Sequence, residues 1–195
     1  MTGPAHALTP PSFIPPELCL TVGVDPTRED SPAACMVAVQ QDVTSKNYSA
    51  RGLELDQVMG LRDTINDAKA KGIDLKVVVL DANPVIDTPL RDIANEVGQQ
   101  HPGATVLVLS PSFVGTYSPS YDRVTLEAGE DLAKTGDAVT STQNFVGQLQ
   151  TPIFNWTALT AVLLIVVFAA AGLTWALRRA AAADGSAEKP TASTV

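Results

Sequence analysis

IDLKVVVLD, at residues 73–81, is the strongest strand pattern in this 195-residue chain. It begins by alternating apolar and polar residues and then becomes continuously apolar, as is typical of a strand buried on both faces. Residues 104–109, ATVLVL, predict a second buried strand. Between the two, residues 88–100 predict a helix with Pro89 in its first turn. The two strands are therefore expected to be parallel.

The residues before this unit predict further helices. In residues 53–71, apolar side chains recur every three or four positions, which predicts an amphipathic helix that ends at Gly72. Residues 31–43 predict a shorter helix, and the polar residues 44–52 predict a loop.

The residues after the second buried strand predict one more strand. Residues 121–129 alternate apolar and polar side chains, which predicts a half-solvated strand preceded by a turn over residues 113–120. Residues 130–135 and 142–150 predict short helices. The fold class that follows is α/β, a small sandwich with a mostly buried sheet and flanking helices.

A membrane anchor is predicted near the C-terminus. Residues 156–177 contain no charged side chain, and a helix of this length is about 33 Å long, enough to span a hydrocarbon core of about 30 Å. Trp156 and Trp175 lie near its two ends, where indole rings favour the membrane interface, and Arg178 and Arg179 end the segment. These features predict one transmembrane helix.

The remaining segments complete the predicted domain organisation. The first sixteen residues contain five prolines, a composition that favours disorder. We expect a disordered leader over residues 1–30, an acidic α/β domain over residues 31–150, the transmembrane helix over residues 156–177 and a disordered tail over residues 178–195.

Cys19 and Cys35 are 16 positions apart and lack the close paired spacing of a zinc site. We expect ordinary buried thiols; a disulfide is the alternative.

Two features of the sequence disagree about orientation in the membrane. Arg178 and Arg179 follow the anchor, and the positive-inside rule therefore places the C-terminus in the cytoplasm and the domain outside. The leader, however, lacks the pattern of a signal peptide, which favours a domain retained in the cytoplasm. We give more weight to the two arginines and predict a cytoplasmic C-terminus.

The charge of the chain excludes some classes of function. The residues before Trp156 include 10 Lys and Arg against 19 Asp and Glu, a net charge of −9, and a domain of this charge is repelled by phosphate backbones. We therefore expect no nucleic-acid partner. His6 and His101 are the two histidines of the chain, which argues against His-dependent catalysis. We predict no catalytic residues, and we favour a protein that is not an enzyme.

Several carboxylates are expected to meet at one end of the predicted sheet. Asp81 ends the first buried strand, Asp87 lies in the loop that follows it, and Asp122 begins the predicted third strand. Oxygen-rich clusters of this kind suit Ca²⁺. The alternative is a solvated acidic surface, since no spacing matches an EF-hand loop. Ca²⁺ is thus the candidate ligand, and no other cofactor is expected.

Two segments carry a resemblance to known proteins: IDTPLRDIA at residues 86–94 and YDRVTLEAGED at residues 121–131. Over about residues 53–180 the chain resembles a family of mycobacterial and corynebacterial single-pass membrane proteins. Members of that family are often encoded beside secreted peptidoglycan endopeptidases. The element order and the Asp122-Arg123 pair are also distantly similar to TPM domains.

The TPM resemblance implies an extracytoplasmic domain that binds Ca²⁺ in some members and acts as an acid phosphatase in others. On that reading Asp81, Asp87, Asp122 and Arg123 are the first positions to test.

Three hypotheses about function follow. The leading one is a non-enzymatic interaction or regulatory module of the cell envelope, held in the lipid bilayer, that binds another envelope or membrane protein and is linked to cell-wall enzymes. The first alternative is a Ca²⁺-binding or phosphatase-like domain of the TPM type. The second is an accessory subunit of a larger membrane complex.

Overall fold

The computed structural model describes residues 13–151 and 156–187. The chain divides after Thr151 into two compact units. The first unit contains a sheet with helices, and the second contains one long helix.

A four-stranded sheet forms the centre of the first unit, with its strands in the order β1-β2-β3-β4. The two predicted buried strands are β2 (Leu75–Val79) and β3 (Thr105–Leu109), which pair in parallel and are buried along their whole length. β1 (Tyr48–Ser49) pairs in parallel with β2, and β4 (Val114–Tyr117) pairs antiparallel with β3. The predicted α/β class and the parallel central pair are confirmed.

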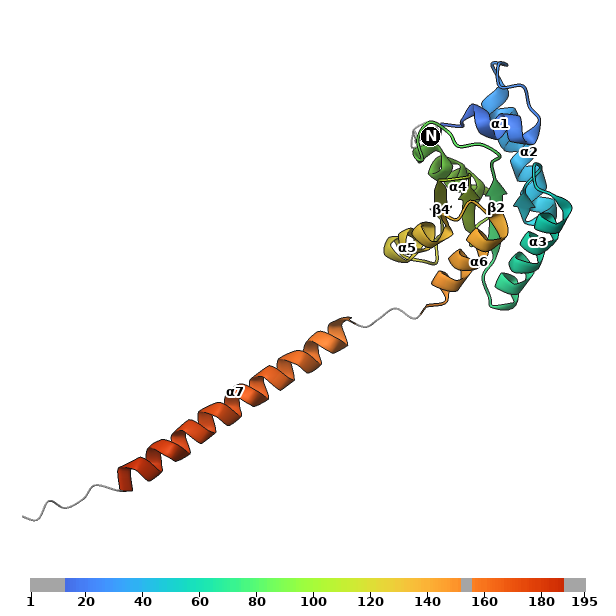
Figure 1. Ribbon diagram of the computed structural model, residues 1–195. Coiled ribbons are helices and arrows are strands. Elements are labelled where there is room, and N and C mark those ends of the chain that lie inside the picture. The colour runs from blue at the N-terminus through green and yellow to red at the C-terminus, as the bar shows by residue number, and fades with distance from the viewer. Residues whose placement is uncertain (1–12, 152–155, 188–195) are drawn as a thin grey trace, which may run out of the picture. The chain divides into compact units, whose positions relative to one another are not determined.

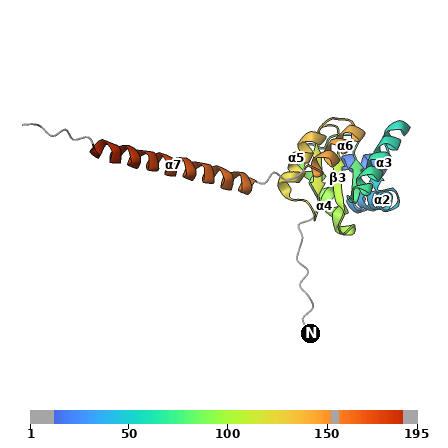
Figure 2. The same ribbon diagram turned by 90° about the horizontal axis from the view of Figure 1, so that it is seen from below.

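Helices cover both faces of the sheet, and Figure 2 shows β3 between α6 on one side and α4 on the other (Figures 1 and 2). Successive side chains of β2 point to opposite faces of the sheet: Val77 and Val79 belong to one apolar core, and Val78 belongs to the other. The first core is closed by α3 (Leu55–Ala70), α5 (Arg123–Ala133) and α6 (Ala138–Leu149). The second is closed by α1 (Pro16–Val22), α2 (Ser31–Lys46) and α4 (Thr88–Gln100).

The predicted strand over residues 121–129 is wrong, because most of this segment belongs to the helix α5. The Asp122 side chain accepts a hydrogen bond of 2.7 Å from the backbone N–H of Thr125 and so caps the helix. Leu126, Gly129 and Ala133 are its buried residues, and their spacing of three and four is that of a helix. Val124, which the alternation placed on the same face as Leu126, is 77% exposed.

The third strand that pairs with β3 is instead β4, in the segment predicted as a turn. Val114, Gly115 and Thr116 are buried there beneath α4 and α5. The sequence of the strand, VGTY, combines a glycine with hydroxyl side chains and so lacks a clear strand pattern. Only the packing of the helices over it identifies the segment as a buried strand. The predicted loop over residues 44–52 likewise contains the short edge strand β1.

A buried lysine joins the end of α2 to β2. Lys76 lies within β2, and its Nζ donates hydrogen bonds of 2.7 Å to Asn47 Oδ1 and 2.8 Å to Asp74 Oδ1. Asn47 ends α2 in the left-handed region with a φ of 69°, a conformation that asparagine tolerates better than most residues. These bonds satisfy the ammonium group, whose burial without partners would be costly.

The predicted disordered leader is wrong for the residues after Pro15. Pro16 starts α1, where its fixed φ suits the first helical turn, and Leu18 and Val22 are buried in the core on the α2 side of the sheet. Residues 1–12 of the predicted leader lie outside the described residues.

The two cysteines are not free thiols. Cys19 of α1 and Cys35 of α2 form a disulfide, with their Cα atoms 5.0 Å apart. The sequence could not show this proximity, because it depends on how α1 packs against α2.

The second unit contains α7 (Trp156–Ala187). Residues 159–179 of α7 are long and apolar enough to cross a membrane, and no other helix in the described parts of the chain meets that criterion. The helix continues beyond the predicted end at residue 177, through Arg178 and Arg179 into a run of alanines, which are the strongest helix formers. The rest of the predicted tail, residues 188–195, lies outside the described residues.

Two glycines provide a matched test of this packing. A Cβ atom on Gly115 of β4 would lie 2.5 Å from the carbonyl carbon of Leu90, whereas one on Gly147 of α6 would meet no atom within 4 Å. We expect Gly115→Ala to lower the free energy of unfolding by about 1–3 kcal/mol through overpacking. Gly147→Ala should leave it unchanged or raise it by up to about 1 kcal/mol. Urea unfolding of the full chain in detergent, followed by circular dichroism, measures both, and equal effects would contradict the close approach of β4 to α4.

Candidate functional site

A cavity of about 250 Å³ lies at the carboxyl ends of β2 and β3. Its walls come from the residues that leave the two strands, from the segment before α3, and from the first turns of α3 and α6. The carboxyl edge of a parallel sheet is where loops converge, and it is the usual place for a ligand in an α/β fold. The polar side chains among its lining residues are Gln57, Asp81, Ser110, Asp137 and Ser141.

Asp81 leaves β2 at the mouth of this cavity. Its backbone N–H donates a hydrogen bond of 3.1 Å to the hydroxyl of Thr21 in α1, which ties the end of the strand to that helix. A Cβ atom on Gly52 would overlap the Asp81 carboxylate. Because Gly52 has no side chain, the exposed carboxylate of Asp81 fits beside it.

Asn83 fixes the loops that follow the two strands relative to each other. Its Oδ1 accepts hydrogen bonds of 2.8 Å from the hydroxyl of Ser110 and 2.8 Å from the backbone N–H of Ser112. The Asn83 side chain thus supplies hydrogen bonds between the two loops, at the point where the backbone pairing of β2 with β3 ends. This crosslink gives the cavity a wall of defined shape.

Asp137 forms the opposite wall and caps α6. Its Oδ1 accepts a hydrogen bond of 2.7 Å from the backbone N–H of Thr140, and its Oδ2 accepts one of 3.3 Å from Gln57 of α3. The hydrogen bonds from Thr140, with a smaller contribution from Gln57, lower the pKa of Asp137. The Asp137 carboxylate is therefore ionised at neutral pH and joins α3 to α6.

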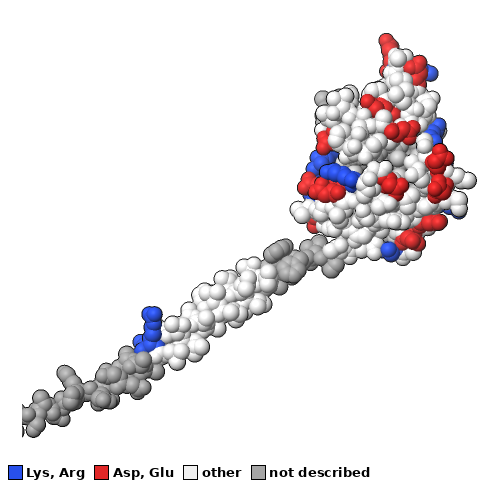
Figure 3. All heavy atoms as spheres, viewed as in Figure 1, with Lys and Arg blue, Asp and Glu red and all other residues white. Residues whose placement is uncertain are grey.

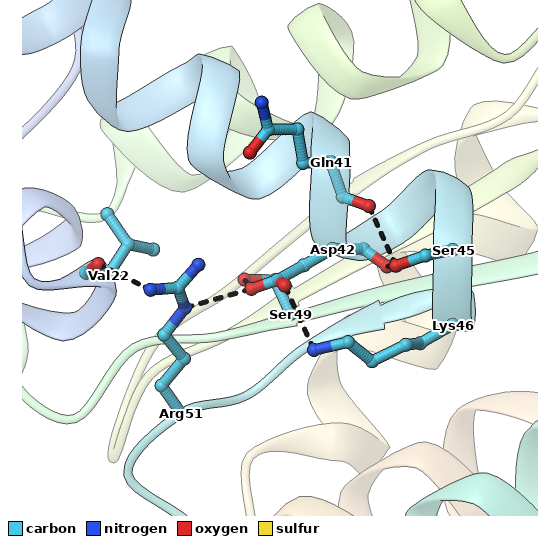
Figure 4. A network of polar contacts seen from close by, with 7 residues as sticks. All are labelled: Val22, Gln41, Asp42, Ser45, Lys46, Ser49 and Arg51. Atoms are coloured by element: carbon cyan, nitrogen blue, oxygen red, sulfur yellow. Dashed lines mark hydrogen bonds and ion pairs between the residues drawn. The ribbon is translucent and has the colours of Figure 1, made fainter.

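A second polar network lies on the α1 side of the sheet and is drawn in Figure 4. The half-exposed Lys46 and Arg51 both donate to the buried carboxylate of Asp42, at 2.9 and 3.0 Å, and the hydroxyl of Ser49 donates at 3.2 Å. The Nη1 of Arg51 also donates to the carbonyl oxygen of Val22, at 2.9 Å. Asp42 thereby connects α2, β1 and the end of α1.

The position of Arg51 links this network to the cavity. Arg51 precedes Gly52, which lines the cavity beside Asp81, and Thr21 bonds to the backbone of Asp81. The end of α1 therefore holds both the 51–52 segment and the end of β2. We infer that the Asp42 network positions the cavity rather than binding a ligand itself.

The structure does not bring the predicted metal ligands together. Asp81 lines the cavity at the ends of β2 and β3, Asp87 lines a separate cavity with Arg91 and Glu130, and Asp122 caps α5. Among the residues that the structure describes, no three His, Cys, Asp or Glu side chains lie close enough to hold a metal ion. Arg123 is paired with Glu127 in an exposed ion pair of 2.6 Å.

Two of the predicted anchor residues contact each other at the end of the apolar segment. The guanidinium of Arg179 lies 4.0 Å from the ring centre of Trp175, in a cation–π contact. Arg178 precedes it at the same end of the segment, whereas the side chain of Trp156 lies outside the described part of the chain. The pair combines an aromatic ring with a charge, the chemistry of a membrane interface.

Most of the residues that shape the cavity were not predicted from the sequence. A signal existed for Asp137, because an aspartate directly before an apolar-periodic segment is a typical N-cap, and for Asp42 and Lys46, whose spacing of four suits an ion pair on a helix. The sequence gives no comparable signal for Gly52, Asn83 or Arg51. Their roles depend on neighbours that are distant in the chain.

The Asp42 network makes stability depend on pH. Burial raises the pKa of Asp42, but the hydrogen bonds and charges of Lys46 and Arg51 outweigh burial and leave the pKa lowered. A lowered pKa contributes stability above the unfolded value of about 4, and this contribution is lost as the pH falls through the folded value. At pH 7 we expect Asp42→Asn to reduce the free energy of unfolding by about 1–3 kcal/mol.

The difference between wild type and Asp42→Asn should shrink as the pH is lowered below about 4. Urea unfolding in detergent at a series of pH values measures this difference. Asp30→Asn is the control, because the ion pair of Asp30 with Arg28 is largely exposed to solvent, and it should change the unfolding curve much less than Asp42→Asn does. A pH-independent effect of Asp42→Asn would contradict the assigned role of its charge.

Comparisons with known proteins agree with the membrane anchor. A family model described as membrane protein Rv1476 matches residues 10–188. The membrane protein Rv1476 of Mycobacterium tuberculosis (strain ATCC 25618 / H37Rv) is 49% identical over 174 residues, which cover 88% of this chain and 83% of that protein.

A solved structure gives a weaker match. The solution NMR structure of the N-terminal domain of the cg2496 protein from Corynebacterium glutamicum is 16% identical, with a TM-score of 0.44, and the match covers 53% of this chain and 77% of that one. The family match and the mycobacterial relative confirm the resemblance to actinobacterial membrane proteins, and they show that the chain belongs to the Rv1476 family of membrane proteins.

Proposed function

We propose that this protein is a non-enzymatic interaction or regulatory module of the cell envelope, anchored by α7, with its α/β domain outside the cytoplasm. The observation that carries the proposal is the disulfide between Cys19 and Cys35. Disulfides form and persist in oxidising compartments and are rare in the cytosol. The disulfide therefore supports an external domain, independently of the charges beside the anchor.

The charges beside the anchor support the same orientation. Arg178 and Arg179 follow the apolar segment directly, whereas no Lys or Arg occurs between Lys134 and Arg178. The positive-inside rule counts such residues close to the ends of the span and favours a cytoplasmic C-terminus. Two features with unrelated physical origins thus support one orientation.

The chemistry of the cavity supports binding as the role of the domain. Its lining residues present the oxygen atoms of Asp81, Asp137, Ser110 and Ser141. Three of these groups already hold structural hydrogen bonds: Asp137 at 2.7 Å to the backbone N–H of Thr140, Ser141 at 2.7 Å to the hydroxyl of Thr135, and Ser110 at 2.8 Å to Asn83. Polar groups that hydrogen bonds hold in fixed positions are well suited to bind a surface of complementary shape and charge. As the partner we propose another envelope or membrane protein, with cell-wall enzymes as the first class to test.

Reporter fusions test the orientation. An enzyme that is active only outside the cytoplasm, fused to the N-terminus, should be active in cells, and the same enzyme fused to the C-terminus should be inactive. Immunoblots of both fusions control for expression. The reverse pattern would overturn the external domain and direct the search for partners to the cytosol.

Thiol labelling tests the disulfide directly. We expect the full chain, denatured without a reductant, to react with no maleimide-polyethylene glycol, because both cysteines are paired. After reduction it should react with two. Labelling of both cysteines before reduction, in protein taken from membranes under alkylating conditions, would remove the observation on which the proposed location rests.

A further inference from the structure

The helix α3 has apolar side chains on two sides. Leu61, Ile65 and Ala68 face the sheet and are buried in the core. Leu55 and Met59, one turn apart, lie on the opposite side of the helix and are 76% and 58% exposed. Because residues four positions apart are neighbours on a helix surface, the two form one apolar strip.

Carboxylates lie along one side of this strip, and Arg62 lies one turn from Met59. Glu54, Asp56, Asp63 and Asp67 are exposed, and among the described residues none of them takes part in an ion pair. The basic residues nearby are Arg62 and Lys69 of α3 and Lys71 just after it. Around the strip itself, Glu54, Asp56 and Asp63 outnumber Arg62. Figure 3 shows acidic side chains over the visible face of the domain, including the side that α3 forms in Figure 1, with a few basic side chains among them.

This arrangement has a cost for the isolated protein. Asp63 and Asp67 are one helical turn apart, where like charges repel, and the strip of Leu55 and Met59 keeps apolar area in contact with water. A partner that covers the strip and brings positive charge would relieve both effects. Methionine suits such a contact, because its flexible side chain adapts to different apolar surfaces.

The same charges argue against other occupants. Anionic lipid headgroups would be repelled by the four carboxylates. A second copy of this acidic domain would bring like charge against like charge, which costs free energy at an interface. A basic segment with an apolar side would not be repelled by these carboxylates.

We propose that the outer face of α3, centred on Leu55 and Met59 and flanked by the carboxylates of Glu54, Asp56, Asp63 and Asp67, binds a basic amphipathic segment of a partner protein. This inference rests on the proposed function as an interaction module and specifies the chemistry of its partner. Apolar side chains of the segment cover the strip, and its Lys or Arg side chains lie against the carboxylates. The carboxylates also accelerate encounter with a basic partner at low salt.

Two model peptides test the proposal with the full chain in phosphatidylcholine nanodiscs. One is an amphipathic helix of Leu and Lys, and the other has the same pattern with Glu in place of Lys. Fluorescence anisotropy, with empty nanodiscs as the baseline, should show binding of the Leu/Lys peptide above that baseline and no binding of the Leu/Glu peptide. Raising the salt concentration should weaken the interaction, because the charges on α3 are exposed.

Variants of α3 locate the binding surface. We expect Leu55→Ser/Met59→Ser, and separately Asp56→Asn/Asp63→Asn, to weaken binding of the Leu/Lys peptide about tenfold. Val37→Ser is the matched apolar control, since Val37 of α2 is 56% exposed, and Glu29→Gln is the matched charge control. All these side chains are exposed, so the circular dichroism spectra should remain those of the wild type.

The outcomes separate this proposal from the broader one. Specific binding that the α3 variants leave unchanged would overturn the α3 assignment and leave an interaction module that uses another surface. No binding above empty nanodiscs would overturn the partner chemistry proposed here, while the orientation would still be decided by the reporter fusions. Self-association of the chain in sedimentation experiments, abolished by Leu55→Ser/Met59→Ser, would instead make this face a contact between copies.

Discussion

The parallel pairing of β2 with β3 is the constraint on which the rest of the domain depends. Both strands are buried on both faces, so each face of the pair must be covered by helices if its apolar side chains are to leave water. The chain provides α3, α5 and α6 for one face and α1, α2 and α4 for the other. The need to cover the second face explains why residues after Pro15 fold despite their proline content.

Polar contacts secure the outer parts of this sandwich. Lys76 and Asp42 carry charges into largely buried positions, and each is satisfied by several partners, as the low polarity of a protein interior requires. The Asp42 network, through Arg51, and the disulfide both hold α1. Because α1 in turn contacts Asp81 through Thr21, the region predicted as disordered helps to shape the cavity at the carboxyl edge of the sheet.

The distribution of charge divides the molecule into two chemical parts. The domain before Trp156 is strongly acidic, and the anchor is followed by two arginines. The acidic residues of the domain serve different purposes. Asp122 and Asp137 cap helices, Asp42 organises an ion-pair network, and those on α3 have no partner among the described residues. Acidic composition alone therefore did not indicate a metal site, because each carboxylate has its own local environment.

A long, unambiguous sequence pattern is enough to predict β2, β3, α3, α4 and the apolar part of α7. In these segments the side-chain periodicity, the flanking Gly or Pro and the length all favour the same structure. The sequence did not determine α5, where Val124, Leu126 and Ala128 fit a strand and Leu126, Gly129 and Ala133 fit a helix. Nor did it determine β4, the Cys19–Cys35 bond or the cavity around Asp81. These depend on contacts between residues far apart in the chain, and only tertiary packing fixes which of them meet.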